Sequence, residues 1–241
     1  MSVVLRSTLF ALFQALATPP FALLALLCAP LRPAVRYRLI TAWSRLMVSA
    51  AGTICGLRYR VIGAEHIPPP PFIVLAKHQS AWETLAFQTI FPRQTWVVKR
   101  ELLWIPFFGW GLAMLSPIAI DRAAGTRALR QLGDQGRDRL EKGLCIVMFP
   151  EGTRMAPRTR GPYHAGGAWL ATQTGTPVLP VAHNAGTFWP RNAFLKRPGC
   201  ITVNVGVPID PAGLTHEQLI GQVEDWIEAE MGRLENRAAT G

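Results

Sequence analysis

A histidine and an acid lie close together just after a short apolar run. His78 follows residues 72–76 and Lys77, and Glu83 comes five residues later. A neutral imidazole whose second nitrogen is held by a carboxylate can act as a general base. On one continuous helix the two side chains would point about 140° apart. They can therefore meet only if His78 lies in a loop and Glu83 in the first helical turn, with Ser80 as the N-cap. The segment from Ser80 to Glu83 also matches a capping box, in which Glu83 only closes the start of the helix.

A second polar segment, Phe149-Pro150-Glu151-Gly152-Thr153-Arg154, also ends an apolar run. Gly152 permits a tight backbone turn. Glu151 can accept a hydrogen bond from a substrate hydroxyl, and Arg154 can bind a phosphate through two N–H groups. The alternative is an ordinary polar turn with surface charges.

Two cations, Lys99 and Arg100, precede a very apolar segment, residues 102–115, which includes Trp104, Phe107, Phe108 and Trp110. Such a combination suits an amphiphile, with a phosphate at one end and an acyl chain along the other. The alternative is a buried helix next to a strand edge.

These segments need elements that bring them to one place, and the chain after residue 57 supplies an alternation of strands and helices. The predicted strands are residues 57–63, 72–76, 96–98, 144–149, 178–181 and 201–207, and the predicted helices are residues 80–90, 126–142, 166–174 and 216–237. This pattern predicts an α/β fold with a largely parallel central sheet flanked by helices. Ligands bind such sheets at the carboxyl ends of the strands, where the polar segments lie.

The front of the chain has a different character. Residues 7–31 carry no charge over 25 positions, which is long enough to span a bilayer. Pro19 and Pro20 are expected to break or kink this helix, so that each half is too short to span. Residues 34–57 predict a second helix. We therefore expect residues 1–57 to be a two-helix membrane anchor and residues 58–241 the catalytic domain.

The charge pattern supports a membrane partner. The net charge is +10, and residues 1–60 contain seven arginines and no acid. Because these arginines alternate with apolar helices, anionic membrane lipids are the expected partner and nucleic acid is not. The arginines would place the domain on the cytoplasmic face of the inner membrane. The alternatives are a cleavable signal peptide, a buried helix of a soluble protein, and a solvated basic loop.

Composition excludes other classes. Hydrophobic residues make up 49% of the chain and charged residues 17%, which excludes a disordered protein. The four cysteines form no Cys-x-x-Cys pair, and no third ligand lies near His78 and Glu83. We therefore expect no metal site.

The motifs together resemble a known family. They are His78 with Glu83, the Lys-Arg-Glu-Leu block with Pro106 and Gly109, the Phe-Pro-Glu-Gly-Thr-Arg string, and Val178-Leu179-Pro180-Val181. In this order and at these intervals they resemble the four motif blocks of the glycerolipid acyltransferases, most closely the bacterial 1-acylglycerol-3-phosphate acyltransferases. The resemblance covers roughly residues 58–210, and the triplet Ile120-Asp121-Arg122 also matches. The two-helix front end is similar to that group as well.

The resemblance implies transfer of a fatty acyl group from a thioester to the hydroxyl of lysophosphatidic acid, giving phosphatidic acid. His78 would be the base, and Glu83 would orient it. Lys99 and Arg154 would bind the phosphate, beside Arg100 and Thr153, and Glu151 and Gly152 would shape the glycerol pocket. The co-substrate would be acyl-CoA or acyl-carrier protein, with no cofactor and no covalent enzyme intermediate.

Three positions depart from the family pattern. The usual Asp of the first motif is Glu83, Ser116-Pro117 replaces a common Gly, and His164 replaces a frequent Lys. These departures concern the choice of acceptor and acyl chain more than the reaction. The alternatives are therefore another lysophospholipid or a lyso-aminolipid acceptor, or a lipid-binding membrane protein without catalysis.

Overall fold

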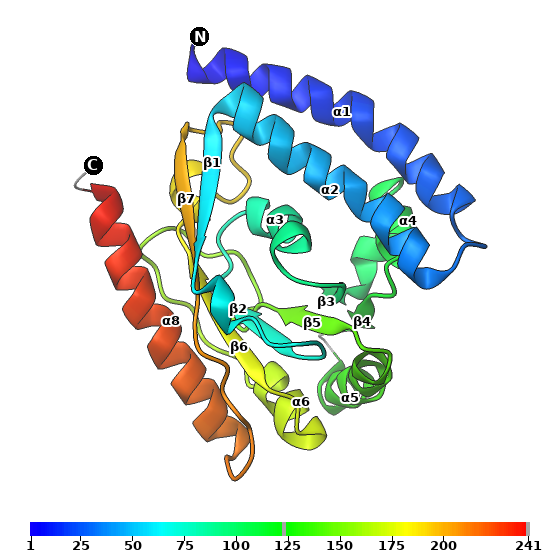
Figure 1. The fold of residues 1–241 in the computed structure, drawn as a ribbon, viewed down its shortest axis with the longest axis vertical. Coiled ribbons are helices and arrows are strands. Elements are labelled where there is room, and N and C mark those ends of the chain that lie inside the picture. Colours follow the sequence, from blue (N-terminus) through cyan, green and yellow to red (C-terminus); the bar gives the residue numbers. More distant parts are fainter. Residues whose placement is uncertain (122–123, 240–241) are drawn as a thin grey trace.

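The computed structural model describes residues 1–121 and 124–239, in which a seven-stranded sheet is covered by helices on both faces (Figure 1). The strand order is β1-β7-β6-β2-β5-β3-β4, and all neighbouring strands run parallel except β6 and β7. The strands are β1 (Leu57–Ile62), β2 (Ile73–Ala76), β3 (Gln94–Lys99), β4 (Ile118–Ile120), β5 (Cys145–Met148), β6 (Val178–His183) and β7 (Gly199–Val205). The expected α/β fold with a largely parallel sheet is confirmed.

The helices follow the predicted ranges closely. They are α1 (Val3–Leu27), α2 (Pro33–Cys55), α3 (Trp82–Ile90), α4 (Phe108–Ala113), α5 (Thr126–Glu141), α6 (Gly166–Thr174), α7 (Ala185–Phe188) and α8 (His216–Ala239), with 3₁₀ helices η1 (Ala64–His66) and η2 (Arg100–Trp104). Sequence reasoning missed β4, α4, α7 and both 3₁₀ helices, which are too short to show a period. Arg122 of the Ile120-Asp121-Arg122 triplet lies outside the described residues.

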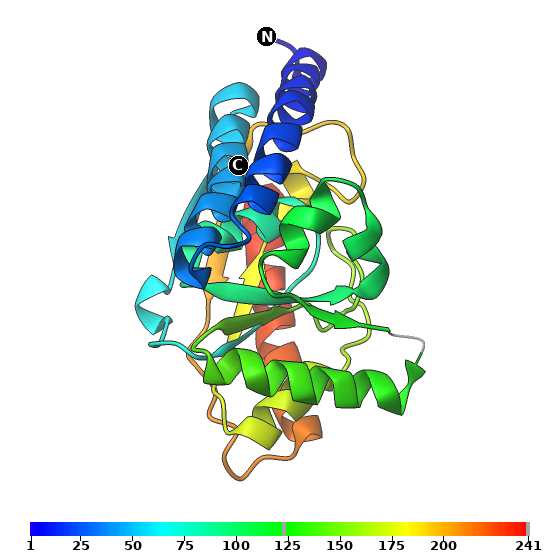
Figure 2. The same ribbon diagram turned by 90° about the vertical axis from the view of Figure 1, so that its right-hand side faces the viewer.

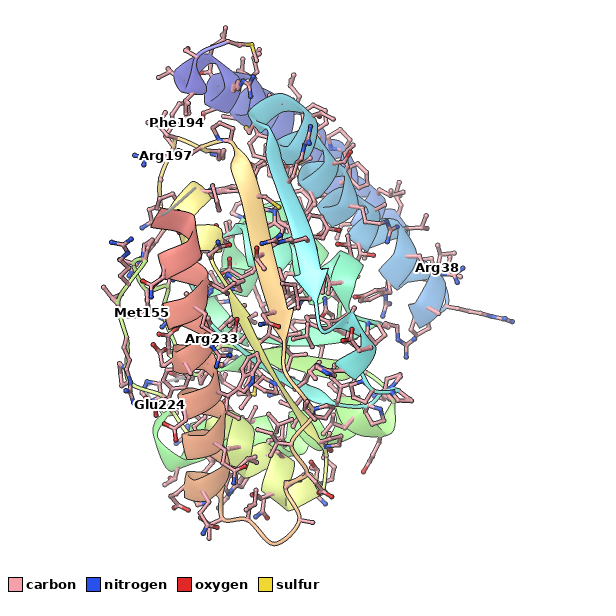
Figure 3. All side chains as sticks on the ribbon, turned by 60° about the vertical axis from the view of Figure 1, so that its left-hand side comes forward. Arg38, Met155, Phe194, Arg197, Glu224 and Arg233 are labelled. Carbon is pink, nitrogen blue, oxygen red and sulfur yellow. The ribbon has the colours of Figure 1, made fainter. Side chains whose placement is uncertain are left out.

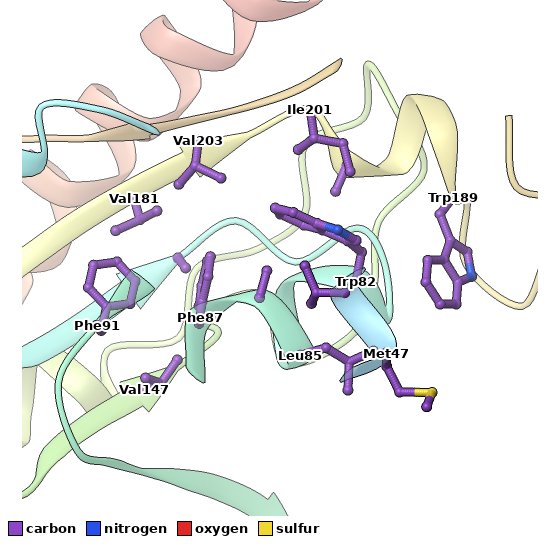
Figure 4. Close-up of a cluster of buried hydrophobic side chains, with 14 of the residues drawn as sticks. Met47, Trp82, Leu85, Phe87, Phe91, Val147, Val181, Trp189, Ile201 and Val203 are labelled. Atoms are coloured by element: carbon purple, nitrogen blue, oxygen red, sulfur yellow. The ribbon is translucent and has the colours of Figure 1, made fainter. Parts of the chain in front are cut away.

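The central strand β2 explains why its sequence is wholly apolar. Successive side chains of a strand point to opposite faces. Val74 and Ala76 pack into one buried cluster with α1, α2 and α3, whereas Ile73 and Leu75 pack into the other with α5, α6 and α8. In the first cluster, Trp82 of α3 lies under the strands of the sheet (Figure 4). Both faces of the strand are therefore dry, and its carboxyl end is held rigidly.

The expected break at Pro19-Pro20 is wrong, because α1 continues through both prolines. A proline inside a helix removes the hydrogen bond to the carbonyl four residues earlier. Those carbonyls belong to Ala15 and Leu16, which lie on the exposed face of α1, where no packing depends on them. Thr18 donates its hydroxyl to the carbonyl of Gln14 at 2.7 Å, which adds a bond next to the gap.

Both expected N-terminal helices are present, and they lie side by side in both views (Figure 1, Figure 2). Among the described residues, α1 is the one helix long and apolar enough to cross a bilayer, with a mean hydropathy of 1.8 in its most apolar window. Its exposed face carries Leu12, Leu16 and Leu27. Arg38 at the start of α2 projects away from the molecule (Figure 3).

The hairpin also contributes to the core of the α/β domain. Phe10 of α1 and Met47 of α2 are fully buried in the same cluster as Val74 of the central strand. The chain changes from helices to a strand at residue 57, but the side chains on both sides of this boundary pack in one hydrophobic core. The division into residues 1–57 and 58–241 remains a prediction about function.

Candidate active site

The loop between β2 and α3 brings His78 and Glu83 together. β2 ends at Ala76 and α3 begins at Trp82, so His78 lies in the loop and Glu83 in the first helical turn. His78 Nδ1 lies 2.8 Å from Glu83 Oε1. The expected N-cap is off by one residue, because Ala81 flanks the helix and the Ser80 hydroxyl accepts the N–H of Trp82 at 3.1 Å.

The dyad and the helix cap use the same carboxylate oxygen. Glu83 Oε1 also accepts the backbone N–H groups of Gln79 at 3.0 Å and Ser80 at 2.8 Å. The bond to Ser80 is one half of a capping box. The two interpretations of the motif therefore do not compete in this loop, because closing the helix start also fixes the carboxylate against the imidazole.

Glu83 is fully buried, and its electrostatic surroundings keep it ionised. Burial alone would raise the pKa of Glu83, but the hydrogen bonds from His78 and from the N–H of Ser80 hold it below its usual value. Its second oxygen, Oε2, is buried without a hydrogen-bond partner in the described part of the chain. An unpaired buried oxygen lowers the stability of the fold. A contribution to stability therefore does not by itself explain why a carboxylate occupies this buried position.

The imidazole of His78 is fixed from two sides. Its ring stacks on Phe149 with ring centres 3.9 Å apart and planes 10° apart. Nδ1 faces Glu83, which leaves Nε2 as the nitrogen available to a substrate. The side chain is 14% exposed and lines a large cavity. The ring is therefore held in one orientation and is still accessible.

A second histidine, His183, lies behind the dyad and is locked neutral. Burial lowers its pKa. Its Nε2 lies 2.8 Å from the carbonyl of Lys77, and its Nδ1 accepts the N–H of Ala185 at 3.3 Å. A carbonyl can only accept, so Nε2 carries the proton. His183 thus supports the backbone beside His78 without adding charge.

Glu151 of the second motif also supports this backbone and does not line the cavity. Its side chain is fully buried. Oε2 accepts the N–H of His78 at 3.1 Å, and Oε1 accepts the ammonium of Lys77 at 2.7 Å and the N–H of Gly161 at 3.3 Å. Glu151 therefore links the two motif loops, residues 77–81 after β2 and residues 149–165 after β5. In this geometry it is not a direct acceptor for a substrate hydroxyl. Sequence reasoning missed Lys77, although its place beside His78 could have indicated a role.

The turn after Glu151 places the remaining residues of this motif. Gly152 has φ +68°, a conformation that favours glycine. The N–H of Met155 then donates to the carbonyl of His78 at 2.7 Å. As a result Thr153 and Arg154 come to lie at the cavity together with His78.

The cavity has a volume of about 950 Å³, at the upper end of the range for small-molecule sites. Its polar lining residues include His78, Lys99, Thr153 and Arg154, and the backbone of Gly152 also lines it. Its other walls are mainly apolar and come from α1, α2, α3, α4, β4 and α5: Phe21, Ile40, Trp43, Leu85, Phe108, Leu112, Ile120 and Leu132. The arrangement fits an amphiphile with an anionic head.

The cations divide into those that line this cavity and those that do not. Lys99 and Arg154 line it, whereas Arg100 is exposed outside it. Arg154 Nε is buried without a hydrogen-bond partner in residues 1–121 and 124–236. Sequence reasoning missed a third cation, Arg191, which lines the cavity and donates to the carbonyl of Arg154 at 3.1 Å. It lies in a loop after the motif blocks, where no spacing rule indicates it.

The apolar segment after Lys99 is not a buried helix. Leu102, Phe107 and Phe108 line the cavity, whereas Trp104 is 72% exposed. The alternative of a buried helix next to a strand edge is therefore wrong, and the apolar side chains of this segment are available to apolar partners. No group of three or more His, Cys, Asp or Glu residues that could hold a metal ion occurs among the described residues.

Comparisons with known proteins identify the family of the chain. The family model described as Acyltransferase matches residues 58–184. The "1-acyl-sn-glycerol-3-phosphate acyltransferase" of Pseudomonas aeruginosa is 40% identical over 95% of this chain and 91% of its own length. The mouse protein "1-acyl-sn-glycerol-3-phosphate acyltransferase alpha" is 30% identical over 73% of this chain and 63% of its own length. The crystal structure of the LPA acyltransferase PlsC from Thermotoga maritima matches with a TM-score of 0.79 and 25% identity, covering 97% of this chain and 98% of that one.

Proposed function

Because the chain belongs to the acyltransferase family, we propose that it transfers a fatty acyl group from a thioester to the free hydroxyl of lysophosphatidic acid. The product is phosphatidic acid. The observation that carries this proposal is that one cavity is lined by His78, by two motif cations, Lys99 and Arg154, and by a long apolar wall. The names of the relatives support the same acceptor.

In the proposed reaction His78 acts as the general base. Its Nε2 takes the proton from the acceptor hydroxyl as the oxygen attacks the thioester carbonyl carbon. Glu83 stabilises the resulting imidazolium through Nδ1–H. The C–S bond then breaks, and the imidazolium returns the proton to the leaving thiolate. No serine or cysteine intermediate is required.

Cations select the head group in this proposal. Lys99, Arg154 and Arg191 line one cavity, and a phosphate monoester carries nearly two negative charges near neutral pH. Charge-assisted hydrogen bonds to phosphate are about twice as strong as neutral ones. A lyso-aminolipid would leave these cations without a counter-ion, so we favour the phosphate-bearing acceptor.

The proposed function is tested by turnover of the purified protein with a panel of acceptors. The panel contains lysophosphatidic acid, lysophosphatidylglycerol and a lyso-aminolipid, each with acyl-CoA and with acyl-carrier protein as the donor. We expect the highest kcat/KM with lysophosphatidic acid. Preference for another acceptor would replace the proposed substrate, and no turnover with any pair would favour a lipid-binding protein. The same panel identifies the donor.

We also propose attachment to the inner membrane with the catalytic domain on the cytoplasmic face. The exposed apolar face of α1 would enter the lipid, and Arg32 and Arg38 would meet lipid phosphates. Salt at about 1 M screens electrostatic attraction but does not weaken the burial of apolar side chains in lipid. High salt alone is therefore expected to leave the protein in the membrane fraction, whereas detergent is expected to release it. Fractionation of the full-length protein checks this. Recovery in the soluble fraction at low salt would contradict it.

A further inference from the structure

The C-terminal helix α8 contacts both motif loops, although it lies outside the residues that match the family model. It runs along the loop that carries Met155 (Figure 3). Three of its acids, Glu224, Glu228 and Glu235, are spaced by four and seven residues, which places them on one face of the helix. Each of them bonds to one or both motif loops.

The middle acid makes the deepest of these contacts. Glu228 Oε1 accepts the ammonium of Lys77 at 2.8 Å and the hydroxyl of Tyr163 at 2.7 Å. Burial and the bond to Glu228 raise the pKa of Tyr163 well above its usual value, so the hydroxyl remains a donor. The contact therefore joins α8 to residues next to His78 on one side and after Arg154 on the other.

Lys77 connects Glu228 of α8 to the loop that carries His78. Its ammonium is only 1% exposed and has three acceptors: Glu151 Oε1, Glu228 Oε1 and the carbonyl of Thr159 at 2.7, 2.8 and 3.0 Å. An ammonium has three N–H bonds, so the set is complete. Glu151 in turn accepts the N–H of His78 at 3.1 Å. A chain of hydrogen bonds, buried at Lys77 and Glu151 and half-buried at Glu228 and His78, thus leads from α8 to the backbone of the histidine.

Glu224 and Glu235, which lie on α8 before and after Glu228, add weaker contacts. Glu235 Oε1 accepts the N–H of Arg158 at 2.8 Å and the side-chain amide of Gln79 at 3.3 Å. Glu224 pairs with Arg160 at 2.7 Å, and the Arg160 side chain is 61% exposed. Exposed pairs contribute little. Among the three, Glu228 is the one whose charge acts in a buried network.

We infer that Glu228 is a positioning residue for the acyl transfer: through Lys77 and Glu151, α8 sets the place of His78 relative to the loop that carries Arg154. Buried charge networks impose one geometry because an incomplete network costs much more than a complete one. A shift of about 1 Å in a catalytic group is enough to cost about a hundredfold in rate. The inference rests on the proposed function, because turnover is its readout.

The test is Glu228→Gln in the full-length protein, with kcat and the KM of both substrates measured. The amide keeps the shape of the side chain and loses its charge. We expect kcat to fall about tenfold, because charged hydrogen bonds are about twice as strong as neutral ones. Both KM values are expected to stay within about twofold, because Glu228 touches neither His78 nor Arg154 directly. A merely structural role would lower the melting temperature without lowering kcat of the folded enzyme.

Glu224→Gln is the matched control, since it makes the same change one turn earlier on the same helix. Its kcat is expected to stay within about twofold of the wild type, as for an exposed pair. Equal kcat values for Glu228→Gln and Glu224→Gln would overturn the inference, and so would a KM effect without a kcat effect. If Glu228→Gln does not fold, Glu228→Asp takes its place, because it keeps the charge and draws the carboxylate away from the Lys77 ammonium: a fall in kcat without a change in KM supports the inference, and an unchanged kcat overturns it. An inactive wild type would refute the proposed function instead.

Discussion

Replacing His78 with alanine is expected to lower kcat by about 10²–10⁴-fold, the usual contribution of a positioned general base. The substitution removes the ring whose Nδ1 bonds to Glu83 and whose Nε2 faces the cavity. The backbone N–H of His78 keeps its bond to Glu151, and Glu83 Oε1 keeps the bonds from the N–H groups of Gln79 and Ser80. Steady-state turnover of the folded variant, checked by circular dichroism, measures the effect.

The control for this prediction separates catalysis from helix capping. Ser80→Ala removes the hydroxyl that caps Trp82 but leaves the dyad in place, so it should cost about 1 kcal/mol of stability and little turnover. Glu83→Gln should impair turnover, because the amide loses the charge that stabilises the imidazolium, and Glu83→Asp should keep more activity. Normal turnover of a folded His78→Ala variant would make the motif a helix cap only.

Much of the fold could be predicted because local patterns in the sequence agree with it. The wholly apolar run of β2 indicated a strand buried on both faces, and α6 has the predicted bounds. The dyad geometry followed from one constraint, since a five-residue spacing can close only across a loop and a first helical turn. Local patterns fix such features, and the structure agrees with them.

What sequence reasoning missed depends on contacts between distant segments. The course of α1 through Pro19-Pro20 depends on which carbonyls face outward, which composition does not reveal. The motif predicts a substrate contact for Glu151, but its partner Lys77 is 74 residues earlier. Arg191 enters the cavity from a loop without a motif. Each depends on tertiary packing that no local spacing encodes.

Replacing Arg154 with alanine is expected to raise the apparent KM for lysophosphatidic acid by about 10–150-fold, because a charge-assisted hydrogen bond contributes roughly 1.5–3 kcal/mol. Arg154 lines the cavity near His78, and its buried Nε has no partner in the described residues, so a phosphate would complete its bonding. The KM for the acyl donor should change far less. Saturation curves for both substrates on the same preparation measure the difference.

Arg158→Ala is the matched control for this last prediction. Arg158 lies in the same loop, its side chain is exposed, and only its backbone N–H bonds to Glu235. Its KM values should stay near those of the wild type. Arg154→Lys should recover only part of the affinity, because an ammonium lacks the two parallel N–H bonds of a guanidinium. Equal weakening of both substrates in Arg154→Ala would indicate a damaged fold, and unchanged KM values would remove Arg154 from the head-group site and leave Lys99 and Arg191 to bind the phosphate.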